Sequence, residues 1–372
     1  MRNIRKFVAP EIVFGDGALE LLGRYAANLG ASRVFMVTDP GVGRTGLVDG
    51  AVAVLRSSGV EVVVYDRVSP NPRDHEVMEG AAAYRRHDCD VIVAMGGGSP
   101  MDCAKGISVV SANHGDILDF EGIDRVDVPG PPLICVPTTA GSSADVSQFA
   151  IVNNAATRMK IAIISKSMVP DVALIDPATT LSMDRHLTLC TGIDALVHAI
   201  EAYVSTAGSD LTDLHALGAI RLLRRHLPDV LERLDDLRLR GRIMLASLGA
   251  VHAMAHSLGG LLDLPHGECN GLLLDHVVAF NYSAAPERYD LVGEIFGARL
   301  TGLPPERRGR AVAAALRAFR EQMGLQPGLG RRGVRPEDVG VLARKALADP
   351  CMATNPRRAQ PADIEAIYRE AL

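Results

Sequence analysis

Histidines and one aspartate recur at helical spacing in the second half of the chain. Asp194 and His198 stand four residues apart in GIDALVHAIEAYVS, and His252 and His256 stand four apart in GAVHAMAHSLGG. Residues four apart on a helix project from one face, so each segment offers two side chains to a shared point. His266 follows after the loop GGLLDLP. A carboxylate and several imidazoles presented in this way are typical ligands of a divalent cation.

Each of these residues has an ordinary structural explanation when it is taken alone. A single histidine on an apolar helix face is more often a core residue with a hydrogen-bond partner, and Asp194 can serve as a helix N-terminal charge. Their joint occurrence in helices of such low polarity is harder to explain, because every buried polar group would need its own partner. The sequence therefore predicts a metal site formed by these helices.

Two glycine clusters in the first half compete for the phosphates of a dinucleotide. TDPGVGRTG, residues 38–46, contains the literal G-x-G-x-x-G fingerprint after an apolar run, and Asp66 follows at a tolerable distance for a ribose contact. Against this cluster, Pro40 stands where the tight turn would begin, and Arg44 is bulky for the approach of a pyrophosphate. The fingerprint alone is weak support for a phosphate loop.

GGGSPMDCAKG, residues 96–106, is the better phosphate cradle. Gly96, Gly97 and Gly98 end an apolar run and permit backbone conformations that other residues avoid. Successive N–H groups at the start of a helix bind anions, and Ser99 can add a hydroxyl and cap that helix. A tight turn without a ligand is the ordinary alternative, but the sequence favours this cluster.

Short β-branched runs alternate with amphipathic segments through the first half of the chain. The predicted strands are 34–39, 60–66, 91–99, 132–140, 160–165 and 172–176. This alternation is typical of a doubly wound α/β domain, which we expect over residues 1–180. From about residue 181 the strand signals stop and helical patterns continue, so residues 181–372 are expected to form an all-helical domain.

Composition excludes several classes of function. The 372 residues carry a net charge of −5 with no basic stripe, so we expect no nucleic-acid partner. The start of the chain lacks the apolar region of a signal peptide, and no later window approaches the roughly 18 apolar residues that a membrane span needs. The six cysteines are spread singly, as expected where thiols stay reduced. We therefore expect a cytoplasmic protein that acts on small molecules.

The chain resembles the iron-containing (group III) alcohol dehydrogenase family over essentially its full length. The motifs that carry the resemblance, in the family's order, are GGGSPMDCAKG, VPTTAG, DPATTL, GIDALVHAIEAYVS, HAMAHSLGG and PHGECN. The resemblance implies the dehydroquinate synthase-like architecture of this family: an α/β NAD-binding domain over 1–180, an all-α metal-binding domain over 181–372, and an active site in the cleft between them. It also implies a homodimer or a higher homo-oligomer.

The resemblance assigns roles to individual residues. It implies that Asp194, His198, His252 and His266 bind one divalent metal, Fe²⁺ in preference to Zn²⁺, and that His256 is a catalytic residue beside the nicotinamide. The implied cofactor-binding residues are Asn71, Gly96, Gly97, Gly98, Ser99, Asp102, Thr138, Thr139, Ser142, Phe149 and Lys160. Asp39 matches the position that meets the adenosine ribose, which favours NAD(H) over NADP(H). The alternative is that Asp39 only caps the turn that follows it, in which case its removal would not alter cofactor selectivity.

The implied activity is that of a metal-dependent NAD(P)-linked alcohol dehydrogenase or aldehyde reductase. Hydride would pass between nicotinamide C4 and a metal-bound primary alcohol or aldehyde. The alternatives are a glycerol-dehydrogenase-like or maleylacetate-reductase-like oxidoreductase of the same fold, or a regulatory homologue with reduced catalysis. Two departures from the family pattern, SSADVSQF with Asp145 and SMDRH at 182–186, bear on the substrate pocket and leave the metal residues intact.

Overall fold

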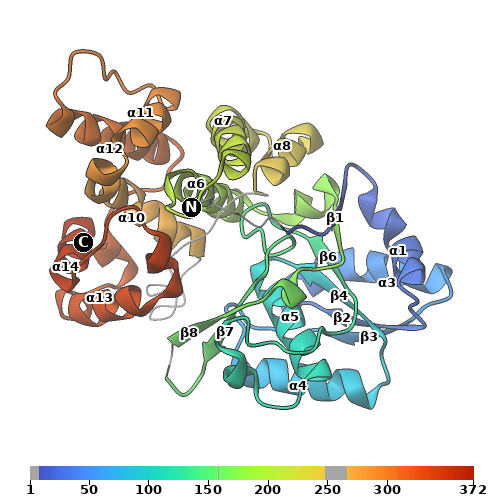
Figure 1. Cartoon of the computed structure of the whole chain (residues 1–372). Helices are drawn as coiled ribbons and strands as arrows, with labels where there is room; N and C mark the ends of the chain where they lie inside the picture. The colour runs from blue at the N-terminus through green and yellow to red at the C-terminus, as the bar shows by residue number, and fades with distance from the viewer. Residues whose placement is uncertain (1–7, 158, 248–265) are drawn as a thin grey trace. The chain divides into compact units, whose positions relative to one another are not determined.

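The computed structural model describes residues 8–157, 159–247 and 266–372. The chain divides into two compact units, Met1–Ser182 and Met183–Leu372. In Figure 1 the first unit runs from blue to green and the second from green-yellow to red. Each unit has its own hydrophobic core and is described separately below.

The first unit is built on a parallel sheet with the strand order β1-β9-β6-β4-β2-β3. Its strands are β1 (Glu11–Phe14), β2 (Arg33–Val37), β3 (Glu61–Tyr65), β4 (Val91–Gly96), β6 (Leu133–Pro137) and β9 (Val172–Ile175). All of the strand pairs in this sheet are parallel. A smaller sheet combines β5 (Gly122–Ile123), β8 (Met159–Ile164) and β7 (Phe149–Asn154), with β7 and β8 antiparallel.

Helices cover both faces of the parallel sheet. The helices of this unit are α1 (Leu22–Asn28), α2 (Pro40–Gly43), α3 (Leu47–Ser57), α4 (Asp74–Arg86) and α5 (Gly98–Ala112), with short 3-10 turns at Ala18–Leu21, Ile117–Phe120, Lys166–Met168 and Pro177–Ser182. Alternate residues of β2 point to opposite faces. Phe35 joins the core beneath α4 and α5, and Val34 joins the core beneath α1 and α3.

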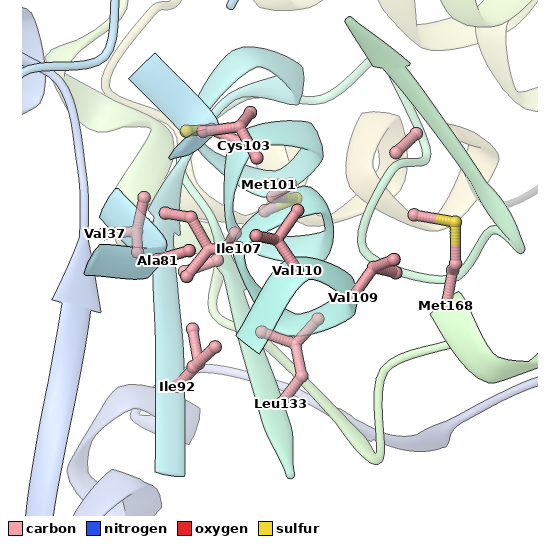
Figure 2. Close-up of a cluster of buried hydrophobic side chains, with 14 of the residues drawn as sticks. Val37, Ala81, Ile92, Met101, Cys103, Ile107, Val109, Val110, Leu133 and Met168 are labelled. Carbon is pink, nitrogen blue, oxygen red and sulfur yellow. The ribbon is translucent and has the colours of Figure 1, made fainter. Parts of the chain in front are cut away.

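The core beneath α5 combines aliphatic and sulfur-containing side chains with a few aromatic rings such as Phe35 and Tyr65. Figure 2 shows Cys103, Ile107 and Val110 of α5 gathered with Val37 and Ile92 of the sheet. Because the strands are buried on both faces, their sequences are continuous apolar runs, and these runs made the α/β class predictable. The predicted fold class, an α/β unit followed by an all-α unit, is confirmed.

The smaller sheet differs from what the sequence suggested. The predicted strand 160–165 lies in the smaller sheet as β8 and not beside β9 in the parallel sheet. Its partner β7 was not predicted, and neither was β1, an edge strand whose Ile12 and Phe14 are exposed. Both strands lack a clear alternation of apolar and polar residues, and β1 in addition pairs with the distant β9, whereas β7 pairs with the next strand, β8.

The described part of the second unit contains helices and no strands. Its helices are α6 (Arg185–Val204), α7 (Asp210–Glu232), α8 (Leu237–Ser247), α10 (His266–Asn281), α11 (Pro286–Ile295), α12 (Pro305–Gln322), α13 (Val339–Ala348) and α14 (Pro361–Ala371), with 3-10 turns at Tyr282–Ala284, Leu329–Arg332, Pro336–Asp338 and Pro350–Thr354. One core lies between α10, α13 and α14, where Leu272, Leu342 and Tyr368 are fully buried.

Helix α6 is more apolar than the sequence prediction allowed. An 18-residue window of this 20-residue helix has a mean hydropathy of 1.3, so α6 is long and apolar enough to cross a membrane, which corrects the expectation that no such window exists. In the structure 78% of that window is buried. Because α6 packs against both α7 and α10, its composition is explained as that of a central core helix.

Two glycines of α10 allow this helix to approach α6 closely. A Cβ at Gly267 would overlap the carbonyl oxygen of Cys190 on α6. A Cβ at Gly271 would lie 2.8 Å from the Cγ2 of Ile193, closer than side chains pack. The spacing between the two helices is therefore set by backbone contact, and the residues near Gly267 on both helices are brought close together.

We predict that Gly267→Ala destabilises the second unit. The added methyl group meets a backbone oxygen that cannot rotate away, so overpacking should cost about 1–3 kcal/mol. Gly218→Ala is the matched control, because Gly218 is also helical and a Cβ there meets nothing within 4 Å. The denaturation midpoint of the metal-free protein should fall in Gly267→Ala and stay equal or rise in Gly218→Ala. Equal midpoints in the two variants would contradict this packing argument.

Candidate cofactor and metal sites

The carboxyl ends of β2, β4 and β6 form the candidate cofactor site. Strand β2 pairs with β3 on one side and with β4 on the other. The chain therefore adds strands in one direction from β2 to β3 and in the opposite direction from β4 onward, and the switch point lies between β2 and β4. Ligands of open α/β sheets bind at such a switch point, outside the carboxyl ends of the strands. Asp39 follows β2, residues 96–98 end β4 and begin α5, and Thr138 and Thr139 follow β6.

The glycine turn between β4 and α5 requires glycine at its first position. Gly96 has a φ of 154°, and a Cβ there would lie 2.6 Å from the Cγ of Pro100. Its carbonyl oxygen accepts a 2.8 Å hydrogen bond from the N–H of Thr138. Gly97 is the N-cap of α5, a helix of 15 residues. The N–H groups of the first turn are therefore presented as an anion-binding surface.

The loop after β6 packs against the same glycine turn. A Cβ at Gly97 would lie 3.2 Å from the Oγ1 of Thr139, and a Cβ at Gly98 would lie 3.1 Å from the Cβ of Ser142. The two segments thus lie within side-chain contact although about 40 residues separate them. The predicted phosphate residues from GGGS and from TTAGS belong to one surface.

A third segment reaches the turn through Ser99. The Ser99 Oγ accepts a hydrogen bond of 3.1 Å from the backbone N–H of Asn71. Asn71 has a φ of 56°, in the left-handed region that few residues other than glycine, asparagine and aspartate adopt. The loop between β3 and α4 is thereby fixed beside the start of α5, which brings the predicted Asn71 to the cofactor site.

Charged groups lie one turn further along α5. Burial raises the pKa of Asp102 to about 7, while the positive charges of Lys105 and Lys160 oppose the shift. Lys105 is fully buried, and its Nζ donates hydrogen bonds of 2.8 Å to the carbonyl oxygens of Ser147 and Phe149. Lys105 therefore fixes the start of β7 to α5. The sequence prediction missed it, although a lysine inside the apolar run DCAKGISVV was a visible signal.

Asp39 is held in place by a helix cap. Its Oδ1 accepts hydrogen bonds from the N–H groups of Gly41 at 2.7 Å and Val42 at 3.0 Å, at the start of α2. A Cβ at Gly96 would lie 3.4 Å from the Oδ2 of Asp39. One carboxylate oxygen thus caps a helix, and the other faces the glycine turn of β4.

The literal fingerprint in TDPGVGRTG does not form a phosphate turn. Its residues make the short helix α2, and Gly46, with a φ of 79°, precedes α3. A helix of four residues offers no extended N-terminal turn comparable with that of α5. The geometry therefore favours residues 96–99 as the phosphate cradle.

In the second unit, three of the predicted metal ligands come together. Asp194 and His198 lie on α6, and His266 is the first residue of α10. Their ligand atoms all lie within 4.8 Å of one another. Asp194 and His198 are buried, so the side chains of this cluster are largely shielded from solvent.

The residues of this cluster fit a divalent ion. The Nδ2 of Asn270 donates a 2.7 Å hydrogen bond to the Oδ1 of Asp194 and so orients the carboxylate. Carboxylate oxygen and imidazole nitrogen without sulfur suit Fe²⁺ or Zn²⁺. Asn270 was not predicted, although its position four residues after His266 was a usable signal.

Two predicted residues lie outside the described part of the chain. His252, the fourth predicted ligand, and His256, the predicted catalytic residue, both fall within 248–265. Their roles stay predictions, as does the expected active-site cleft between the two domains.

Phe149 and Lys160, which are also predicted cofactor-binding residues, lie on β7 and β8 of the smaller sheet.

Comparison with known proteins gives the family. Residues 9–177 match the family profile described as iron-containing alcohol dehydrogenase. Residues 188–372 match the profile described as the C-terminal part of the Fe-containing alcohol dehydrogenase family. The chain belongs to the iron-containing alcohol dehydrogenase family. The predicted resemblance is thereby confirmed, and the protein is an oxidoreductase of this family.

Relatives match the chain along its whole length. It is 37% identical to 1,3-propanediol dehydrogenase of Klebsiella pneumoniae, with 98% of each chain covered. It is 34% identical to NAD-dependent methanol dehydrogenase of Bacillus methanolicus, covering 98% of this chain and 99% of the relative. A crystal structure of 1,3-propanediol oxidoreductase superposes with a TM-score of 0.95 at 37% identity, covering 100% of both chains. Family membership supports a metal and NAD as the cofactors.

We predict that Gly98→Ala weakens NADH binding and that Gly43→Ala does not. The methyl group at position 98 meets Ser142 and occupies the phosphate approach, whereas a Cβ at Gly43 meets nothing within 4 Å. Titration of NADH should show an increase in Kd of at least about tenfold, or 1.4 kcal/mol, in Gly98→Ala. The change in Gly43→Ala should stay below about twofold. A large loss of affinity confined to Gly43→Ala would reverse the assignment of the phosphate cradle.

Proposed function

We propose that this oxidoreductase transfers hydride between NAD(H) and a small primary alcohol or aldehyde, with Fe²⁺ as its metal. The observation that carries the proposal is the convergence of Asp194, His198 and His266 from two helices. A carboxylate and imidazoles in this arrangement match the donor set that the family resemblance requires. The glycine turn at the switch point of the sheet supports the nicotinamide dinucleotide as the second cofactor.

Different residues of the chain bind the dinucleotide and the divalent ion. The N–H groups at the start of α5 hold the pyrophosphate, and Asp39 accepts hydrogen bonds from the adenosine ribose. Asp194, His198 and His266, with His252 as the predicted fourth ligand, hold the divalent ion, which when bound supplies Lewis acidity toward the substrate oxygen. Asn270 keeps the carboxylate of Asp194 oriented for this task.

The substrate class is proposed from the relatives and from the charge of the site. The relatives act, by their names, on 1,3-propanediol, methanol and, at 33% identity, lactaldehyde in Escherichia coli. These substrates are small, and each carries a hydroxyl or aldehyde group. Three neutral imidazoles and one carboxylate around a divalent ion leave one net positive charge, which favours negative charge on the substrate oxygen.

The proposal is tested by turnover of anaerobically purified protein whose metal content has been measured. We expect about one iron per chain and NADH-dependent reduction of short aldehydes. His266→Ala should lose most of the iron and lower kcat/KM at least about a thousandfold. His114→Ala, at an exposed loop position of the first unit, should change neither quantity. Full iron occupancy with unchanged turnover in His266→Ala would remove His266 from the site.

Cofactor preference is predicted from Asp39. Its carboxylate would face the 2′-phosphate of NADP, and two like charges at about 4 Å cost about 4 kcal/mol at an effective dielectric of 20. That cost corresponds to roughly a thousandfold preference for NADH before rearrangement or screening. Asp39→Asn is the sharpest variant, because an amide oxygen can still cap α2 while the charge is removed.

The measurement is the ratio of kcat/KM for NADH to that for NADPH, with one aldehyde. We expect the ratio to fall at least about tenfold in Asp39→Asn, with kcat/KM for NADH little changed. Asp39→Gly should lower the ratio too, but with a loss of stability, because the cap of α2 is removed. A wild type that prefers NADPH, or an unchanged ratio of the two kcat/KM values in Asp39→Asn, would contradict the role of Asp39 in cofactor preference.

A further inference from the structure

A second cluster of metal-ligating side chains lies on α6 and α10, beside the first. His186 and Cys190 stand four residues apart on α6, one turn before Asp194, and Glu268 follows His266 on α10 by two positions. Their ligand atoms all lie within 4.8 Å of one another. The proposed function uses none of these three residues.

Two of the three distances within this cluster are close to the edges of a metal tetrahedron, and the third, between Cys190 and Glu268, is below 4.8 Å. The His186 Nε2 lies 3.6 Å from the Cys190 Sγ and 3.6 Å from the Glu268 Oε2. With Zn–N near 2.0 Å and Zn–S near 2.3 Å, a tetrahedral site places nitrogen and sulfur about 3.6 Å apart, and nitrogen and oxygen about 3.3 Å apart. The two distances from His186 are therefore those of an ion bound between these side chains.

The surroundings orient Glu268 for this role. The Nε of Arg332 donates a 2.9 Å hydrogen bond to Glu268 Oε1, which leaves Oε2 directed toward His186. The side chain of Glu268 is only 9% exposed, so its carboxylate is fixed by protein contacts. Arg332 thus performs for Glu268 the orienting role that Asn270 performs for Asp194.

The cluster is also open to solvent on one side. The His186 side chain is 60% exposed, whereas Cys190 is buried. An ion can therefore enter past the imidazole, and water can supply a fourth ligand. The distance between the two helices is fixed at Gly267, where an added Cβ would overlap the carbonyl oxygen of Cys190.

The ordinary alternative is a hydrogen-bonded cluster without an ion. The Cys190 thiol would then donate to the His186 Nε2, and His186 would pair with Glu268 only when protonated. Burial, reinforced by the charge of Glu268, raises the pKa of the Cys190 thiol to about 12. A divalent cation would reverse this effect, since binding displaces the thiol proton to solvent and places positive charge beside both anions.

We propose that His186, Cys190 and Glu268 form a second divalent cation site, suited to Zn²⁺, that joins α6 to α10. The thiolate is the distinguishing ligand, because sulfur with imidazole and carboxylate selects zinc over Fe²⁺ and Mg²⁺. The site has a structural role: it ties together the two helices that carry Asp194, His198 and His266. It does not rest on the proposed dehydrogenase reaction.

The test is anaerobic titration of Co²⁺ into the metal-stripped, reduced full chain. Only a thiolate ligand gives the near-ultraviolet sulfur-to-cobalt charge-transfer band, so the Asp194 site, which has no sulfur, does not contribute to it. We expect the band to saturate at about one thiolate-bound cobalt per chain and to disappear when Zn²⁺ is added. Addition of Zn²⁺ should raise the midpoint temperature of thermal unfolding by more in the wild type than in His186→Asn.

Three variants make the result decisive. Cys190→Ser should abolish the band, and His186→Asn should weaken cobalt affinity at this site at least about tenfold. Cys89→Ser, which removes a thiol in the first unit, should leave the band intact. His186 is exposed, so its variant should keep the wild-type circular dichroism. A wild type that binds cobalt without the band, or a band that persists in Cys190→Ser, would overturn the proposal.

Discussion

The contact between the Gly267 backbone and the carbonyl of Cys190 is the constraint on which the chemistry of the second unit depends. It lets α10 lie against α6 with no side chain between them, and His266 and Glu268 flank Gly267 on either side. Asp194 and Cys190 occupy successive turns of the facing helix. One backbone contact therefore places both the Asp194 cluster and the His186 cluster, and any displacement of α10 would disturb the two together.

In the first unit too, glycine residues allow two segments to approach each other closely beside the candidate site. Gly97 and Gly98 let the loop that follows β6 approach the start of α5, where a side chain would displace Thr139 or Ser142. Polar side chains then fix the arrangement: Ser99 holds Asn71, and Lys105 holds the start of β7. In both units, glycine permits the close approach and a hydrogen bond orients the neighbouring functional group.

The sequence predicted those features that depend on local pattern. Buried parallel strands are continuous apolar runs, and Asp194 and His198 share a face of α6, so the fold class and half of the metal set followed from spacing. Features that depend on the register of distant segments were not predicted. Cys190 and Glu268 are 78 residues apart and meet only because of the helix contact at Gly267. The edge strand β1 emerged only from the structure, whereas the cap formed by Asp39 was an alternative that the sequence already offered.

The central claim is that the first unit holds the dinucleotide while the second unit supplies the metal that turnover requires. The most direct measurement compares NADH binding and aldehyde reduction in the chain before and after the metal is stripped and restored. We predict that NADH affinity changes by less than about twofold on stripping, whereas turnover falls at least about a thousandfold and returns with Fe²⁺. Turnover that persists in the metal-free chain, or NADH binding that is lost with the metal, would contradict this division of roles.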